Sequence, residues 1–375
     1  MSSTALSYAP TQRVNTAITI ELTTPVDDNR PVFIVGNFNN WSVDEQRFKL
    51  RRLSHGKFMF SFPKDMILPA RLEYKYVRGG WENKELDDFG NTTENRVLET
   101  TKSIVQDYVP RWSNYGLTFN PSFLPKIKVL DEKFYMPQLK KTRKVSVLLP
   151  YNYDKNTQKR YPVLYLQDGQ NLFNPQSPYG NWAIDQKLAV LAEKGVGDVI
   201  VVAIDHAGEE RVNEFLPIPN AKVGTAAEGK KYVHFIADTL KPFVDTQFRT
   251  LPDRLHTGIG GSSLGGLVSI YAGLMYPSVF GRLMVFSPSL WVTQNAPLEN
   301  IGFTTPLPTK IYAYAGGREG ASMIPNVQRF RDNLKNRGIR DAEINFKLVT
   351  DPQGAHSEMR WGQEFPKAVE WMFFY

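Results

Sequence analysis

Two adjacent serines, Ser262 and Ser263, stand in the stretch GIGGSSLGGLVSIYAG (residues 258–273), which holds six glycines. Only Ser263 fits the pattern G-x-S-x-G, because a frame centred on Ser262 would need a glycine where Leu264 stands. A nucleophile at the tip of a sharp strand-to-helix turn needs glycine two residues before and after it, since side chains there would collide with neighbouring elements. We therefore predict Ser263 as a nucleophile. A glycine-rich turn that serves only close packing is the alternative.

A nucleophilic serine needs a general base, and the chain has five histidines. His55 lies in a strand-rich segment, His234 in a helical pattern and His256 just ahead of the serine strand. His206 follows a strand-like run and could line a cleft. For a serine in this strand–turn–helix setting the chain order is nucleophile, acid, histidine. Only His356, on the loop DPQGAHSE, satisfies that order, although a structural histidine at a loop–helix junction would occupy the same place.

The acid that orients the histidine should follow the strand between these two residues, KIYAYAGGREG (residues 310–320). This position favours Glu319, with Asp351 at the end of the next strand as the rival. A tetrahedral oxyanion also needs two donors. We assign them to the backbone N–H groups of Leu264 and of Gln170, which follows the strand-like run YPVLYLQDG. An ordinary strand-to-helix turn is the alternative for Gln170.

The segments that would position these groups alternate between strand-like and helical patterns. Strands are predicted at residues 143–150, 161–169, 198–206, 256–262, 282–291, 310–317 and 344–351, and helices at 183–195, 229–248, 264–277, 325–338 and 368–375. Regular alternation of this kind means β-α-β crossovers. We predict a mostly parallel sheet with helices on both faces, which we assign to a domain of residues 127–375.

The N-terminal part follows a different pattern. Short runs of period two, separated by Asn, Asp, Gly and Pro, occupy residues 16–24, 30–38, 57–63, 71–79 and 94–101. They predict an antiparallel all-β sandwich at residues 12–105. Residues 106–126 are rich in Pro and Asn without a sustained period, which is typical of a linker.

The composition excludes several kinds of site and of binding partner. The 375 residues contain no cysteine, so disulfides, thiolate metal sites and a cysteine nucleophile are excluded. The net charge of +7 is scattered rather than gathered in a basic stripe, so no nucleic-acid partner is expected. No uninterrupted apolar run approaches about 18 residues, so no membrane span is expected. The start of the chain shows no signal-peptide pattern, which makes the cytoplasm the default expectation and leaves a processed secreted form open.

The second half, residues 127–375, resembles the esterase D and enterochelin-esterase group of α/β-hydrolases. The matching stretches are YPVLYLQDGQNLF, IDHAGEERVNEFLP, GSSLGGLVSIYAGLMYPSVFG, FSPSLW and GAHSEMRW. The resemblance implies an α/β-hydrolase fold and ester hydrolysis through an acyl-enzyme, with no metal or other cofactor. It carries over Ser263 as nucleophile, His356 as base, and Gln170 with Leu264 at the oxyanion site.

Two further points depend on this resemblance. Many relatives have Asp where Glu319 stands, so the acid is the position at which the chain departs from the family pattern. Arg211, Asn213 and Glu214 match a cleft-lining R-x-N-E segment of similar proteins, which implies a substrate-binding role for Arg211 and Glu214. A buried structural ion pair explains the same residues.

The first module resembles the glycogen- and starch-binding modules, which are immunoglobulin-like sandwiches, in VFIVGNFNNWS, LEYKYVRGGW and NTTENRVLE. In that pattern Trp41 and Trp81 would flank a glucan, while Lys75 and Asn95 match the polar contacts. Sugar rings present C–H faces that pack on indole, and amide or ammonium groups bond their hydroxyls. The alternative is a module that only shapes or covers the esterase cleft.

Together these features predict a serine carboxylesterase that removes acetyl or feruloyl-type groups from a small-molecule or oligosaccharide ester, with the carbohydrate held by the N-terminal module. The alternative within enzymes is a hydrolase of siderophore triesters, anionic metal complexes that a net charge of +7 could attract. The alternative of another class is a non-catalytic glycan-binding scaffold on a hydrolase frame.

Overall fold

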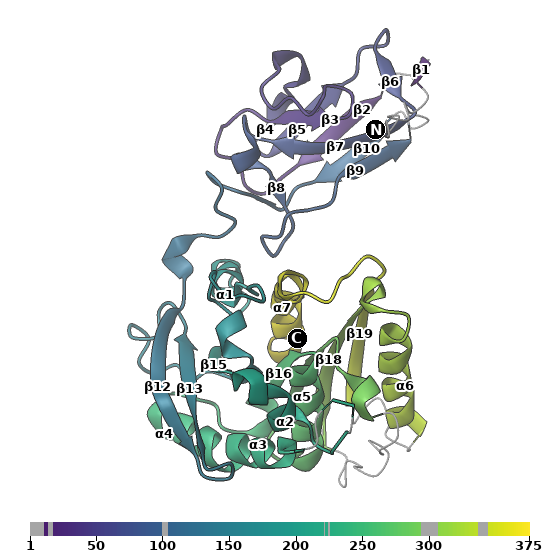
Figure 1. Cartoon of the computed structure of the whole chain (residues 1–375). Coiled ribbons are helices and arrows are strands. Elements are labelled where there is room, and N and C mark those ends of the chain that lie inside the picture. The colour runs from purple at the N-terminus through teal and green to yellow at the C-terminus, as the bar shows by residue number, and fades with distance from the viewer. Residues whose placement is uncertain are drawn as a thin grey trace. The chain divides into compact units, whose positions relative to one another are not determined.

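The computed structural model describes residues 11–13, 18–99, 104–220, 222–223, 226–293, 307–336 and 344–375. The chain divides into two compact units, Met1–Asn120 and Pro121–Tyr375 (Figure 1). The division between them falls inside residues 106–126, the segment with a linker-like composition.

An eight-stranded sheet forms the centre of the C-terminal unit (Figure 1). In spatial order its strands are β12 (Lys126–Met136), β13 (Lys141–Leu149), β15 (Ile200–Ile204), β14 (Val163–Gln167), β16 (Thr257–Ser262), β17 (Arg282–Phe286), β18 (Thr309–Gly316) and β19 (Ile344–Asp351). The pairs β12–β13 and β13–β15 are antiparallel, and the other five pairs are parallel. The predicted mostly parallel sheet is therefore confirmed.

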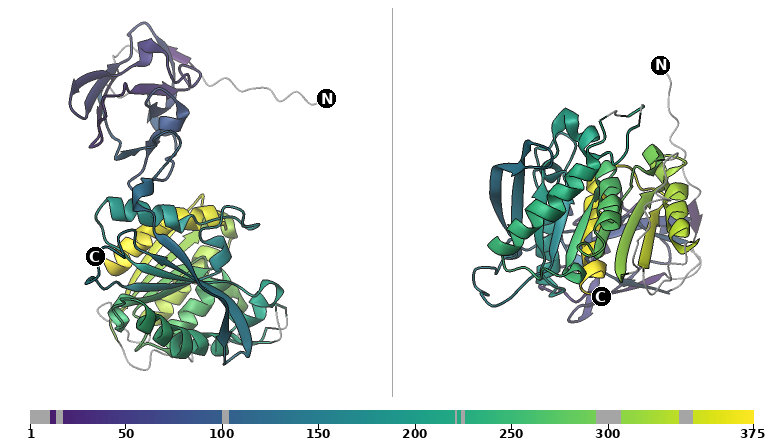
Figure 2. Two further views of the ribbon diagram at one scale, coloured as in Figure 1. Left: turned by 90° about the vertical axis from the view of Figure 1, so that its left-hand side faces the viewer. Right: turned by 90° about the horizontal axis from the view of Figure 1, so that it is seen from below.

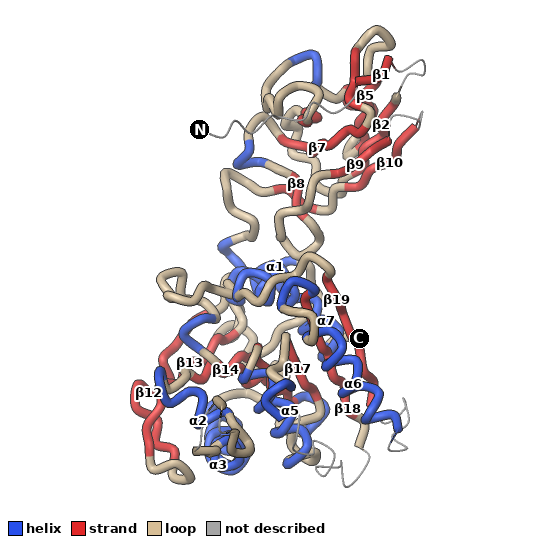
Figure 3. Tube along the Cα trace, turned by 45° about the vertical axis from the view of Figure 1, so that its right-hand side comes forward, coloured by secondary structure: helices blue, strands red, loops and turns tan. Residues whose placement is uncertain are grey.

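Helices cover both faces of this sheet (Figure 2). On one face α1 (Ile184–Glu193) packs beside α7 (Glu358–Phe373), as Figure 3 also shows. The other face carries α5 (Leu264–Met275), the short α2 (Arg211–Phe215), α6 (Met323–Asn336), and α3 (Gly229–Phe235), which continues through a π turn into α4 (Lys241–Gln247). Within the described ranges no helix is long and apolar enough to cross a membrane.

The edge strand β12 was not predicted from the sequence. Of its 11 residues only Phe134 and Met136 are buried, and charged residues occupy most of the exposed positions. Its pairing with β13 is interrupted by register shifts on both sides of Asp131. An edge strand with charges and bulges resists pairing with other chains. The same features remove the period-two apolar pattern by which a strand is recognised.

Helix α7 begins at Glu358, directly after the loop of His356, whereas the helical pattern at the end of the sequence was assigned only to residues 368–375. Ser357 is its N-cap, and the Ser357 hydroxyl accepts a hydrogen bond from the backbone N–H of Arg360. Gly362 and Pro366 lie inside the helix and conceal its start in the sequence. A Cβ at Gly362 would lie 2.1 Å from the carbonyl oxygen of Trp182, so this glycine lets α7 approach the segment that leads into α1.

The N-terminal unit is built of strands, as predicted. One sheet has the order β10 (Ile104–Tyr108), β2 (Thr19–Thr23), β5 (Lys57–Ser61), β4 (Arg51–Ser54), and a second has β3 (Phe33–Gly36), β7 (Arg71–Val77), β9 (Arg96–Glu99). Two short pairs join β1 (Thr11–Arg13) to β6 (Ile67–Pro69) and β8 (Glu85–Leu86) to β11 (Arg111–Trp112). Side chains of both larger sheets share one buried core, including Ile20, Phe58, Ile34 and Tyr76.

One pairing departs from the predicted antiparallel pattern, because β10 runs parallel to β2. This strand ends at Tyr108, so the ordered sheet continues beyond residue 105, where the sequence pattern places the end of the module. An immunoglobulin-like topology for this unit stays a prediction.

A buried hydrogen bond joins the sheet to α7 in the C-terminal unit. The Tyr312 hydroxyl on β18 donates to Glu364 at 2.5 Å, and both side chains are almost fully buried. We expect Tyr312→Phe to lower the free energy of unfolding by about 1–3 kcal/mol, because the buried Glu364 oxygen loses its donor. Tyr135→Phe, at an exposed position on β12, is the control. Urea denaturation measures both, and equal stability of the two variants would contradict the expectation.

Candidate active site

Ser263 occupies the turn between β16 and α5, with φ 57° and ψ −122°. Its backbone N–H donates to the carbonyl of Phe286 on the neighbouring strand at 2.9 Å. A Cβ at Gly261 would lie 3.0 Å from the carbonyl carbon of Gly265, and a Cβ at Gly265 would lie 3.1 Å from the Cβ of Gln167. These approaches are tighter than ordinary van der Waals contact. The glycines on both sides of Ser263 are therefore steric requirements, as the sequence pattern indicates.

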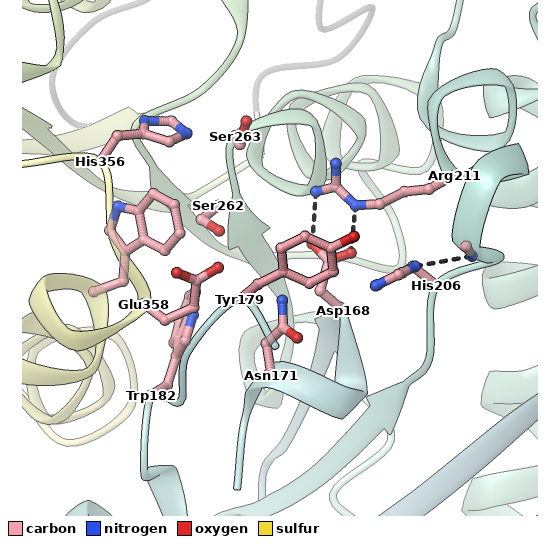
Figure 4. A pocket seen from close by; sticks show the side chains of 12 residues that line it. Asp168, Asn171, Tyr179, Trp182, His206, Arg211, Ser262, Ser263, His356 and Glu358 are labelled. Carbon is pink, nitrogen blue, oxygen red and sulfur yellow. Dashed lines mark hydrogen bonds and ion pairs between the residues drawn. The ribbon is translucent and has the colours of Figure 1, made fainter. Parts of the chain in front are cut away.

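Ser263 lines a cavity of about 410 Å³ at the carboxyl edge of the sheet (Figure 4). The cavity is lined by Asp168, Asn171, Tyr179, Trp182, His206, Gly208, Arg211, Ser262, Ser263, His356, Glu358 and Trp361. The structure thus brings Ser263 and His356, which are far apart in the sequence, to one cavity. His206, considered from the sequence as a cleft residue, lines it too.

His356 is held by Glu319. Its Nδ1 lies 2.6 Å from Oε2 of Glu319, whose side chain is fully buried. The other carboxylate oxygen accepts hydrogen bonds from the Gly316 backbone N–H and from the Ser287 hydroxyl, both at 2.7 Å. With Nδ1 directed at Glu319, Nε2 is the nitrogen left for other partners, and the ring is turned toward Ser263 in Figure 4.

Asp351, the rival acid, has a different partner. It lies 2.7 Å from Nε of Arg360 and accepts a backbone hydrogen bond from Gln353. Burial alone would raise the pKa of Asp351, but the hydrogen bonds from Arg360 and Gln353 outweigh it and hold the pKa below its ordinary value. In this structure His356 is paired with Glu319 and Asp351 is paired with Arg360.

Two serines of the stretch FSPSLW support the site, and sequence reasoning missed both. Ser287 bridges the site, because its hydroxyl donates to Glu319 and accepts from Nε1 of Trp361 at 2.9 Å. Ser289 Oγ lies 3.2 Å from Ser263 Oγ. Polar residues directly after a parallel strand meet at the carboxyl edge of the sheet, and that position was the available signal.

The two backbone groups assigned to the oxyanion site lie in turns. Leu264 is the first residue of α5, so its N–H has no partner within the helix. Gln170 lies in the 3₁₀ turn Gly169–Asn171 after β14, whose own hydrogen bonds use the N–H groups of Asn171 and Leu172. The Gln170 side chain exchanges two hydrogen bonds with the backbone of His206, at 2.8 and 3.2 Å. These bonds anchor the turn to the end of β15.

Of the R-x-N-E segment, Arg211 lines the cavity and Glu214 does not. Arg211 forms two hydrogen bonds with Asp168, at 2.6 and 2.8 Å. Burial works against the charge of Arg211, but Asp168 outweighs it and raises the pKa of the guanidinium. Glu214 is buried and bonded to Arg143 at 2.7 Å and to Lys141 at 3.1 Å. The alternative of a structural ion pair thus describes Glu214.

In the N-terminal unit the two candidate tryptophans lie together. The ring centroids of Trp41 and Trp81 are 6.2 Å apart at an interplanar angle of 39°, and Trp81 is 41% exposed. Lys75 is buried and donates to the carbonyl of Thr93, and Asn95 donates to Glu73 at 3.3 Å. The structure therefore pairs the aromatic candidates, while the polar candidates contact other residues of the unit.

The family model described as “Putative esterase” matches residues 137–372. The chain belongs to this esterase family. It is therefore assigned to the carboxylic ester hydrolases.

Of three curated relatives of this esterase, two carry esterase names. It is 24% identical over 243 residues to the uncharacterized protein YbbA of Bacillus subtilis, covering 62% of this chain and 92% of YbbA. It is 25% identical over 237 residues to an iron(III) salmochelin esterase of Escherichia coli, covering 59% of this chain and 52% of that esterase. It is 26% identical over 173 residues to an endo-1,4-beta-xylanase/feruloyl esterase of Xylanibacter ruminicola, covering 43% of this chain and 22% of that protein.

Solved structures share the fold. A ferulic acid esterase aligns with a TM-score of 0.52 at 18% identity, covering 67% of this esterase and 98% of that chain. The enterobactin esterase FES of Shigella flexneri aligns with a TM-score of 0.54 at 17% identity, covering 97% of this esterase and 95% of that chain. The predicted hydrolase fold of the C-terminal unit is thus confirmed.

Asp205, at the end of β15, offers a test of the electrostatics beside the cavity. A Cβ at Gly169 would lie 2.6 Å from Oδ1 of Asp205, so this carboxylate packs against the turn that carries Gln170. Burial raises the pKa of Asp205 from 3.8 to about 6. A group that holds its proton more tightly in the folded state weakens folding as the pH rises through this interval.

We therefore expect Asp205→Asn to raise the thermal midpoint above pH 6, because the variant carries no buried charge there. The expected shift is about 2–4 °C, which is what ~1 kcal/mol produces in a unit of this size. The difference should vanish near pH 4, where Asp205 is protonated in the folded protein. Calorimetry across this range measures it, and a shift independent of pH would contradict the assignment.

Proposed function

We propose that this esterase acts through a serine nucleophile, with Ser263 attacking the ester, His356 as general base and Glu319 as the acid that orients the histidine. The observation that carries the proposal is the 2.6 Å contact between Nδ1 of His356 and the buried Glu319, with both Ser263 and His356 lining one cavity. A buried carboxylate on Nδ1 selects the tautomer in which Nε2 accepts a proton.

In the first half of the reaction, Nε2 of His356 takes the proton of the Ser263 hydroxyl while Oγ bonds to the carbonyl carbon of the ester. The negative oxygen of the tetrahedral intermediate receives hydrogen bonds from the N–H groups of Leu264 and Gln170. The imidazolium then gives its proton to the departing alcohol, and an acyl-enzyme remains. Water activated by His356 hydrolyses the acyl-enzyme and restores the serine.

The Ser263 hydroxyl contacts Ser289 in the structure, so it must rotate toward His356 before attack. Catalytic hydrogen bonds are often completed only when substrate binds. The backbone of the turn is held by the neighbouring strand, so the proposal calls for movement of the Ser263 side chain.

For the substrate we propose acetyl or feruloyl-type esters. A cavity of about 410 Å³ suits a small acyl group or a single aromatic ring. Trp182 and Trp361 line the cavity with apolar surface, and their ring centroids lie 6.0 Å apart. The names of the feruloyl esterase relative and of the ferulic acid esterase structure support this class.

We also propose that the N-terminal unit is an immunoglobulin-like module that holds the carbohydrate part of the substrate. The paired rings of Trp41 and Trp81 support it, since two indoles at this spacing offer apolar faces to sugar rings. Siderophore triesters are the second candidate substrate. Alignment of 97% of the chain with an enterobactin esterase favours them, because it extends over both units.

The first test separates the two candidate acids. Ser263→Ala and Glu319→Gln should each reduce kcat for p-nitrophenyl acetate by about 10³-fold or more, because one removes the nucleophile and the other the carboxylate that orients the base. Asp351→Asn is the matched control, since it removes a carboxylate that bonds Arg360 instead of His356, and it should retain kcat within about threefold. Equal loss in Asp351→Asn and Glu319→Gln would refute the assignment of the acid.

The second test addresses the carbohydrate. Trp81→Ala should weaken retention of the protein on glycogen or amylose by about tenfold, which corresponds to losing the ~1–2 kcal/mol of one stacking ring. Tyr115→Ala removes another exposed aromatic ring of the same unit and should leave retention unchanged. Affinity electrophoresis measures both. Absence of retention in the unaltered protein would rule out glucan binding.

A further inference from the structure

The cavity contains a carboxylate that has no counter-ion. Asp168 is paired with Arg211, and Glu319 is paired with His356. Glu358, the first residue of α7, also lines the cavity. In the part of the chain that the structure describes, no cation or side-chain donor lies within bonding distance of the Glu358 carboxylate. The carboxylate is bonded to its own backbone N–H. A partly buried carboxylate that has neither a counter-ion nor a side-chain donor is costly, which calls for an explanation.

The surroundings keep Glu358 directed into the cavity. A Cβ at Gly180 would lie 3.1 Å from the Cβ of Glu358 and 3.3 Å from its Oε2, so the loop around Gly180 packs against the side chain. Gly180 has φ +110°, a conformation that favours glycine. Burial is the main cause that raises the pKa of Glu358, while the hydrogen bond from its own backbone N–H and the charges of His356 and Arg211 oppose the rise. Figure 4 shows the carboxylate extending into the cavity toward the ring of Tyr179.

Two neighbouring groups complement this acceptor. The side-chain oxygen of Asn171 accepts from the Ser177 hydroxyl at 2.7 Å, which leaves the Asn171 NH₂ group as a donor at the cavity wall. Tyr179 is 67% exposed and contributes both a ring face and a hydroxyl. A carboxylate acceptor, an amide donor and an aromatic ring together suit a ligand with hydroxyl groups on an apolar ring.

We propose that Glu358, Asn171 and Tyr179 form a subsite that binds an uncharged, hydroxyl-bearing ring of the ester substrate, and that the Glu358 carboxylate, whose charge no ion pair neutralises among the described residues, selects against anionic esters. This proposal rests on the proposed serine esterase function. A substrate hydroxyl that donates to Glu358 supplies a second donor to the carboxylate, besides its own backbone N–H. An anionic group in the same place would meet uncompensated negative charge. The subsite therefore favours a phenol or a sugar over an anionic metal–siderophore complex.

The test compares three methyl esters of one aromatic acid that carry a hydroxyl, a methyl ether or a carboxylate at the same ring position. In the unaltered enzyme, kcat/KM should be highest for the hydroxyl, about tenfold lower for the ether and about a hundredfold lower for the carboxylate. Glu358→Gln keeps the shape but removes the charge, so the deficit of the carboxylate ester should shrink by about tenfold. Glu370→Gln makes the same change three turns further along α7 and should leave all the ratios as they are.

An equal effect of Glu358→Gln on all three esters would overturn the proposal. So would an unaltered enzyme that cleaves the carboxylate ester as fast as the hydroxyl ester, a comparison that needs no variant to fold. Ser263→Ala, assayed in parallel, separates this failure from failure of the proposed function. If Ser263→Ala still cleaves the esters, the nucleophile assignment fails; if it is inactive, the ratios report on the Glu358 subsite alone.

Discussion

The arrangement of the site depends on how closely main-chain atoms approach one another where β16 turns into α5. A Cβ at Gly260 would lie 2.5 Å from the Cβ of Met284, and the nearest approaches at Gly261 and Gly265 would be 3.0 and 3.1 Å. Because the chain must turn in so little space, Ser263 adopts φ 57° at the tip of the turn. The same geometry places the N–H of Leu264 at the helix start, unused by helix bonds. The positions of the Ser263 hydroxyl and of the Leu264 N–H thus follow from one steric constraint.

A single buried carboxylate links the other elements of the site. Glu319 has no exposed side-chain surface and receives bonds from Gly316, Ser287 and His356. Ser287 follows β17, and its hydroxyl also accepts from Trp361 of α7. Three elements that are separate in the sequence therefore converge on one charge. A carboxylate bonded by this many donors is held in one orientation, and the imidazole that it contacts is held with it.

How far the sequence predicts the structure depends on whether a feature is local. The serine turn and the buried parallel strands could be predicted, because tight turns require glycine and strands buried on both faces read as apolar runs. Strand β12 could not, since its charged exposed face hides the period. The start of α7 was concealed by Gly362, which is required by contact with the distant Trp182. Ser287 and Glu358 were missed for the same reason: their roles depend on residues that only the fold brings near.

The carboxylates around the cavity differ in their partners more than in their chemistry. Asp168, which precedes the turn that carries Gln170, binds Arg211. Glu319 binds His356. Glu358 lies against the same cavity without a counter-ion or a side-chain donor among the described residues. Proteins normally pair buried charges internally. We therefore explain a carboxylate without a counter-ion beside a reactive group by the substrate that binds in the cavity. Salt screens the scattered surface charge of net +7 beyond about 10 Å, so in our proposal the group within contact distance of the substrate decides which ester is retained.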